Sequence, residues 1–115
     1  MPIDPERLNK LTMELRRGVL ILTALSSLQQ EHYGYSLRKT LATVGLEIDE
    51  GTLYPLLRRL EDQGLLSSNW REEQGRKRRF YRISDDGREA LQQMTAEWHN
   101  LNSAMNLLIM KEEQQ

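Results

Sequence analysis

The hydrophobic pattern changes its period along the chain, and this change restricts the possible folds more than any other feature. Up to residue 64, apolar residues recur every three or four positions, which is the spacing of amphipathic helices. Residues 65–71 and 79–83 are instead short β-prone stretches on either side of a turn that contains Gly75. Helical spacing then returns. The pattern predicts a mostly α-helical fold with a small β-hairpin, and this hairpin must pack on the helices because two strands alone are barely stable.

Two helices are predicted in the first part of the chain. Asp4 supplies an N-cap for the first helix, and Pro5 suits its first turn. An apolar stripe steps along this helix at Leu8, Leu11, Leu15, Val19, Leu22 and Leu25. The second helix is expected from Tyr35 to about Val44, and Gly45 is its stop signal.

A third helix is predicted between Asp49 and Gly64, and Gly64 stands where a helix-ending glycine belongs. Its buried side is expected to consist of Leu53, Leu56, Leu57 and Leu60. Proline is unfavourable inside a helix, so Pro55 indicates that the regular part begins near Thr52, whose side chain would then be the cap.

The last helix is predicted to begin after Ser84 and to run to about Met110. Ser84 is a capping side chain, and Asp85 and Asp86 stand beside the positive end of the helix dipole. The apolar positions of this helix are Leu91, Met94, Trp98, Leu101, Met105 and Leu108. They follow a strict heptad spacing, which is narrower than the stripe of a helix in a globular core and is typical of a helix that packs on a partner helix.

Length and composition exclude several classes of function. A chain of 115 residues forms one domain, and with no cysteine it offers no disulfide or thiolate site. Its two isolated histidines, His32 and His99, cannot form a zinc site without carboxylate ligands. We therefore expect no metal and no cofactor. No catalytic constellation or phosphate-binding glycine loop is present, so we expect no enzyme activity. No apolar run is long enough to cross a membrane, and the acidic start is unlike a signal peptide, so a soluble cytoplasmic protein without a membrane partner is expected.

Charge is distributed unevenly along the chain. The formal net charge is -1, but residues 71–83 carry six basic against two acidic side chains, and residues 84–115 carry two against six. Phosphate contact depends on the local field and not on the total charge, so the basic hairpin is a candidate nucleic-acid contact. The alternative is an ordinary solvated charged loop.

The order helix, helix, helix, hairpin, helix is that of a winged helix-turn-helix with an added terminal helix. We predict residues 1–84 as the DNA-binding winged helix-turn-helix and residues 85–115 as a C-terminal dimerisation helix. In such a fold the third helix enters the major groove, and the hairpin, or wing, reaches phosphates or the adjacent minor groove. The alternative is a winged-helix protein-interaction module without DNA binding. Loss of the basic residues would favour that alternative, and here they are present.

Three segments resemble the PadR family of bacterial transcription regulators. They are Tyr33-Gly34-Tyr35, the run from Gly51 to Leu66 with its Thr-Leu-Tyr-Pro and Arg-Leu-Glu elements, and the wing from Gly75 to Ser84. The resemblance covers about residues 8–110, and the short terminal helix is similar to that of the small-subunit branch of the family. Phe80 departs from the family pattern, because many relatives carry a second tyrosine there.

The resemblance implies a homodimeric repressor that binds a two-fold symmetric operator in double-stranded DNA. It also implies that the terminal helix packs against the first helix of the partner subunit. The implied interface residues are Leu8, Leu11, Leu15, Leu91, Met94, Trp98, Leu101, Met105 and Leu108. Some small members bind planar aromatic compounds between the subunits on a tryptophan of the last helix. Trp98 matches that position, and plain dimer packing is the alternative role for it.

The candidate DNA-binding residues lie on the second helix, the third helix and the wing. They are Tyr35, Thr52, Tyr54, Arg58, Arg76, Lys77 and Arg78. Arg58 can pair in bidentate fashion with a guanine, or it can contact a phosphate. Contact with phosphate is expected of Tyr54, Arg76 and Lys77, and packing is the alternative for Tyr54 and Tyr35. Trp70, on the first strand of the wing, is interpreted as a core residue or a support for the wing.

Overall fold

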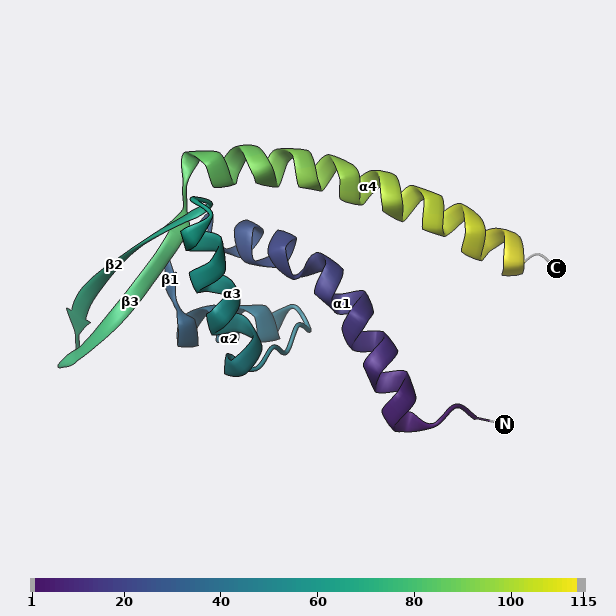
Figure 1. The fold of residues 1–115 in the computed structure, drawn as a ribbon, viewed down its shortest axis with the longest axis horizontal. Coiled ribbons are helices and arrows are strands. Elements are labelled where there is room, and N and C mark those ends of the chain that lie inside the picture. The colour runs from purple at the N-terminus through teal and green to yellow at the C-terminus, as the bar shows by residue number, and fades with distance from the viewer. Residues whose placement is uncertain (1, 114–115) are drawn as a thin grey trace.

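A computed structural model describes residues 2–113 and contains four helices and one three-stranded sheet (Figure 1). The elements follow in the order α1 (Pro5–Ser27), β1 (His32–Tyr33), α2 (Gly34–Thr43), α3 (Glu50–Asp62), β2 (Leu66–Glu73), β3 (Arg76–Ile83) and α4 (Asp85–Glu113). The predicted mostly helical fold with a hairpin and a terminal helix is confirmed. Residue 1 and residues 114–115, at the ends of the predicted regions 1–84 and 85–115, lie outside the described residues.

Polar caps and glycines set the ends of the helices. The Asp4 carboxylate accepts a hydrogen bond from the Arg7 amide at 3.3 Å, and the Ser84 hydroxyl accepts one from the Gly87 amide at 3.0 Å. Gly64 has a φ of +78° after α3, and the amide of the next residue, Leu65, donates back to a carbonyl of the last turn. This left-handed ending favours glycine, as predicted.

The start of α3 differs from the prediction. The helix begins at Glu50 with Asp49 as its N-cap, so Thr52 lies inside the first turn and does not cap the helix. Its hydroxyl donates to Asp49 Oδ1 at 2.8 Å. Pro55 is therefore an interior residue. It removes one N–H from the backbone ladder, and the buried leucine face of the helix offsets this loss.

The sheet has the antiparallel strand order β1-β3-β2. Its long hairpin closes through Gln74 and Gly75, whose φ angles are both positive, at 53° and 78°. Two such residues suit a tight turn that matches the twist of the flanking strands, so β2 and β3 extend further toward the tip than predicted. The two-residue strand β1 was not predicted, and it pairs Tyr33 with Phe80.

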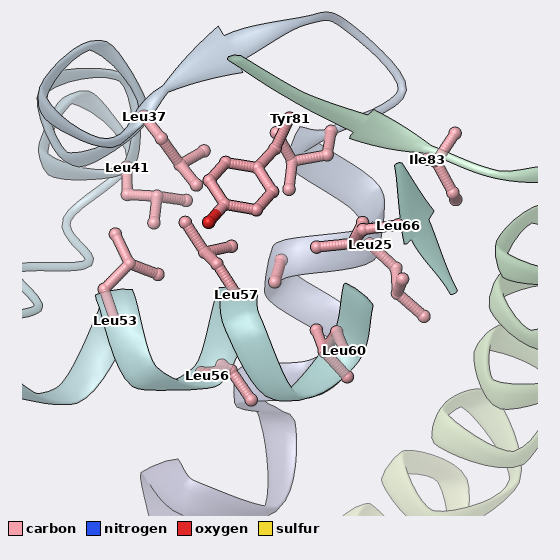
Figure 2. Packing of buried hydrophobic residues seen from close by; sticks show 12 residues of the cluster. Leu25, Leu37, Leu41, Leu53, Leu56, Leu57, Leu60, Leu66, Tyr81 and Ile83 are labelled. Atoms are coloured by element: carbon pink, nitrogen blue, oxygen red, sulfur yellow. The ribbon is translucent and has the colours of Figure 1, made fainter. Parts of the chain in front are cut away.

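The core lies where α1, α2 and α3 meet the base of the sheet. The predicted leucine face of α3 is buried against Leu25 of α1, Leu37 and Leu41 of α2, and Tyr81 and Ile83 of β3 (Figure 2).

Phe80 points to the other side of the sheet, as expected for the residue before Tyr81, yet its side chain is only 7% exposed. The ring of Tyr33 meets it edge-on at 5.3 Å, and the Arg71 guanidinium lies 3.8 Å above its centre. These two neighbours form a small second layer on the outer face of the sheet.

The helices α1 and α4 contact each other near the core and diverge toward their free ends (Figure 1). The second half of α1 and the first turns of α4 contribute to the core, whereas the first half of α1 and the end of α4 expose apolar side chains. The wing projects at the opposite end of the molecule (Figure 1). Within residues 2–113, no helix combines the length and apolar character that crossing a membrane requires.

Candidate nucleic-acid interface

A cleft of about 520 Å³ lies between α3, the start of α2 and the wing. Its lining combines aromatic rings and cations: Tyr33, Tyr35, Tyr54, Trp70, Tyr81, Arg58, Lys77, Arg78 and Arg79. Glycine and leucine complete the lining, and it contains no carboxylate among the residues that the structure describes. Five of the seven candidate DNA-binding residues therefore meet at one site: Tyr35, Tyr54, Arg58, Lys77 and Arg78.

Tyr54 and Arg58 are four positions apart on α3, so they lie on one side of the helix. Arg58 is exposed, whereas Tyr54 is half-buried and packs against the leucine core. The ring of Tyr54 rests on the backbone of Gly34, at the first residue of α2. Tyr54 is thus a packing residue that also forms part of the cleft wall, and its contact with a phosphate stays a prediction.

The structure places Tyr35 and Thr52 at the edges of this region. Tyr35 is exposed at the start of α2, with the Lys39 ammonium 5.5 Å from its ring centre. It lines the cleft and does not pack between helices. Thr52 is exposed on the first turn of α3 and lies outside the cleft lining.

The wing carries its basic residues on two faces. Lys77 lines the cleft, and Arg76 is exposed beside the turn. Arg78 lies 4.3 Å above the ring of Tyr33, which holds its guanidinium at the cleft margin. Glu72 and Glu73 stand opposite Lys77 and Arg76 in the strand register, so they reduce the positive field at the tip.

A hydrogen-bonded network ties the wing to α3, and the sequence did not reveal it. The Arg79 guanidinium on β3 donates to the Glu61 carboxylate on α3 at 2.5 Å and to the Ser68 hydroxyl on β2 at 3.0 Å. Ser68 in turn donates to the other oxygen of Glu61 at 2.5 Å. These three side chains fix the direction of the wing relative to α3.

Trp70 is where the sequence interpretation is wrong. The sequence predicts a core residue or a support for the wing, but the Trp70 side chain is 62% exposed and lines the cleft. The reason is the length of the hairpin: β2 carries Trp70, the partner of Arg79 in the strand register, past Ser68 and the end of the core.

Burial changes the pKa of two groups near this region. Desolvation raises the pKa of the Tyr81 phenol, and the positive charge of Arg79 partly opposes that shift. Desolvation also lowers the pKa of His32 on β1, whose Nδ1 lies 3.1 Å from the Ser36 hydroxyl. Within residues 2–113, no group of three or more His, Cys, Asp or Glu side chains is placed to hold a metal ion.

The predicted interface residues divide into two groups. Leu91 and Met94 are half-buried against the core of their own chain. The exposed group consists of Leu8, Leu11, Leu15, Trp98, Leu101, Met105 and Leu108. Trp98 also lines a hollow of about 540 Å³ between α1, α2 and α4, together with apolar residues such as Val19, Leu22 and Val44.

Comparisons with known proteins agree on one family. Residues 21–93 match the model of the transcriptional regulator PadR-like family. The chain is 42% identical over 79 residues to transcriptional regulator Rv3488 of Mycobacterium tuberculosis, an alignment that covers 68% of this chain and 74% of that protein.

Solved structures with the same fold include several that are named as PadR regulators. The structure of a PadR family transcriptional regulator from Eggerthella lenta has a TM-score of 0.83 and 42% identity, and the match covers 90% of this chain and 93% of that one. A PadR-like regulator from Bacillus cereus has a TM-score of 0.75 and 32% identity, with 84% and 96% covered. This family consists of transcriptional regulators and not of enzymes. From its sequence match and its fold, the chain belongs to the PadR-like family of transcriptional regulators.

Proposed function

We propose that this protein represses transcription by binding, as a homodimer, to a two-fold symmetric operator in double-stranded DNA. The observation that carries the proposal is the cleft between α3 and the wing, where Arg58, Lys77 and Arg78 meet tyrosine hydroxyls without any carboxylate in the described lining. Such a lining attracts phosphate and offers hydrogen-bond donors to it. A regulator of this kind acts on the chromosome, so we propose a cytoplasmic location.

Two exposed apolar stripes support the dimer. The first half of α1 and the end of α4 present large hydrophobic side chains to solvent, at the end of the molecule away from the wing. Monomeric soluble proteins rarely expose large contiguous apolar patches. A second copy related by a two-fold axis would cover them and present two copies of α3 to two half-sites, which gives the operator its symmetry.

Footprinting on the DNA just upstream of the protein's own gene tests this proposal. We expect protection of two half-sites whose centres are one helical turn, about 34–36 Å, or a multiple of it apart. Added protein should lower transcription from a promoter that overlaps them. Absence of protection would contradict the proposed operator. A rise in transcription would contradict the proposed repressor role.

The alternative function is a winged-helix module that binds proteins only. The retained cations of the cleft and of the wing tip argue against it, since a docking surface has no need of a phosphate-attracting field. Weak retention on heparin or DNA resin at low salt would favour this alternative.

We propose in addition that a planar aromatic ligand releases the DNA by binding between the Trp98 side chains of the two subunits. A residue on a two-fold axis faces its own copy, so two indoles can hold a flat molecule from both sides. The acidic segment 84–115 favours a cationic ligand.

Titration with a cationic DNA-intercalator-like dye, followed by tryptophan fluorescence, tests this site. Quenching in the wild type that disappears in Trp98→Ala supports it. Quenching that persists unchanged in Trp98→Ala places the dye elsewhere, and no quenching at all leaves Trp98 as a packing residue.

A further inference from the structure

We infer that the cleft between α3 and the wing is a binding site for one sugar–phosphate strand of the duplex, and that Trp70 packs against a deoxyribose of that strand. This inference rests on the proposed DNA binding and assigns to Trp70 a role in it.

The first observation is the position of Trp70 on the hairpin. In the strand register it stands opposite Arg79, two positions from the pair Ser68 and Tyr81. Opposite residues of an antiparallel pair share a face, so Trp70 lies on the face that looks toward α3. Further down this face, Tyr81 and Ile83 are buried in the core, but Trp70 remains 62% exposed.

The second observation is what surrounds the exposed indole. Trp70 shares the cleft with Arg58 on α3 and Lys77 on β3, which come from its two walls. Arg79 is neutralised by Glu61, whereas Arg58 and Lys77 have no ion-pair partner among the residues that the structure describes. The cleft thus combines an apolar surface with two available positive charges, which is complementary to a chain of sugars and phosphates.

The geometry of winged-helix binding selects the occupant. When α3 lies in the major groove and the wing tip reaches the adjacent minor groove, one phosphate strand separates the two grooves. That strand has to cross the space between α3 and the wing, which is the cleft. The bases of an intact duplex stay paired inside the helix, so the surface offered to Trp70 is the C–H face of a deoxyribose.

Two consequences distinguish this contact from an ionic one. A sugar contact carries no sequence information, so loss of Trp70 weakens binding to operator and to random DNA alike. It also releases no counterion, so it changes the affinity without changing the dependence on salt.

The experiment uses the fact that the chain has two tryptophans, Trp70 and Trp98. In the full-length variant Trp98→Phe, Trp70 is the sole tryptophan. Its fluorescence is excited selectively over that of the tyrosines, and its quenching by acrylamide is measured with and without a short random-sequence duplex. Anisotropy of a labelled duplex in the same sample reports binding. Subtracting the emission of Trp70→Phe, which comes from Trp98, from that of the wild type gives the acrylamide quenching of Trp70 in a chain with Trp98 intact.

We expect bound duplex to shield Trp70 from acrylamide and to leave the Trp98 emission of Trp70→Phe unshielded. Equal quenching of Trp70 with the duplex bound would overturn the inference and leave the proposed DNA binding standing. If no anisotropy change occurs in the wild type, the proposed DNA binding fails and the inference fails with it.

A second measurement compares two substitutions across a range of salt concentrations. Trp70→Ala should weaken binding by up to about tenfold per protomer, to the same degree on operator and random duplex and with an unchanged salt slope, since one aromatic contact corresponds to roughly that factor. Lys77→Ala should lower the slope. Trp70→Tyr should restore most of the affinity, and circular dichroism of each variant checks its fold. Wild-type affinity in Trp70→Ala, or a slope lowered as in Lys77→Ala, would contradict the sugar contact.

Discussion

The backbone of Gly34 in α2 and the ring of Tyr54 in α3 are in direct contact. A Cβ atom on residue 34 would stand 2.5 Å from Cε1 of Tyr54, closer than atoms of two residues approach. The contact requires a residue without a side chain at this position. It also joins α2, which is proposed to cross the DNA backbone, to α3, which is proposed to read the major groove.

Gly34→Ala is therefore expected to displace the Tyr54 ring and to lower the free energy of unfolding by about 1–3 kcal/mol, the usual range for overpacking. Because Tyr54 forms part of the cleft wall, the affinity for operator and random duplex should fall together. Denaturant unfolding and duplex titration measure the two effects.

The double variant Gly34→Ala/Tyr54→Ala is the control for this prediction. Removing the ring removes the clash, so the double variant should lose less stability than the sum of the two single variants. Additive losses would show that the Gly34 effect has another origin.

The network of Glu61, Ser68 and Arg79 is predicted to set the direction of the wing. Arg79→Ala leaves the half-buried Glu61 carboxylate without its partner and should cost about 1–2 kcal/mol of stability, a moderate value because both side chains are partly exposed. Hydrogen exchange of the amides of β2 and β3 should accelerate more than that of α1. If Arg79→Ala and Glu61→Gln changed stability additively in the double variant, the two side chains would not be coupled.

Most of the fold follows from the sequence, because the signals are local. Helical spacing, the polar caps at Asp4 and Ser84, and the glycines after α2 and α3 act within a few neighbouring residues. The features that the sequence did not reveal depend on distant partners. Strand β1 has two residues, too few for any periodic pattern, and Phe80 is buried by Tyr33 and Arg71 from other strands.

The same distinction applies to the site. The basic wing and the exposed side of α3 follow from residue types, so the sequence predicted Arg58 and Lys77 as candidates. The cleft that brings them together depends on the angle of the hairpin, where Arg79 of β3 contacts Glu61 of α3 across a long sequence separation. The exposure of Trp70 depends on where the core ends beneath β2, and no local pattern reports that.

Stability is predicted to depend on pH through His32. Its pKa is lowered in the folded chain by burial, so the unfolded chain binds the proton at higher pH than the folded chain does. The contribution of His32 to stability should be constant above the usual histidine pKa of about 6.5 and should fall as the pH drops below it. Urea unfolding of wild type and His32→Gln checks this.

The variant should lose less stability than the wild type between about pH 7 and pH 5. His99→Gln, with its substitution on the exposed surface of α4, is the control. Identical pH dependence of wild type and His32→Gln would contradict the prediction.

Dimerisation is predicted to depend on the exposed apolar side of α4. Leu101→Glu/Met105→Glu places charges where a partner would pack, and both side chains are exposed in the single chain, so each chain should still fold. Light scattering should return one-chain mass, 13.5 kDa, in place of twice that value, and DNA binding should weaken. Ser103→Glu, which helical spacing places on the opposite side of α4, should remain dimeric. A wild-type mass of one chain at micromolar concentration would contradict the proposal.

DNA binding through the cleft is tested most directly by measuring duplex affinity as a function of salt concentration. The measurement compares wild type, Lys77→Ala and Arg58→Ala on operator and random DNA. The wild-type affinity should fall steeply as salt rises, and Lys77→Ala should lower the slope by about one unit per protomer on both duplexes. Arg58→Ala should cost about 1–3 kcal/mol more on the operator than on random DNA if it pairs with a base. Equal losses on both duplexes would make Arg58 a phosphate contact. Duplex binding that is absent, or a salt slope that Lys77→Ala leaves unchanged, would contradict DNA binding through the cleft.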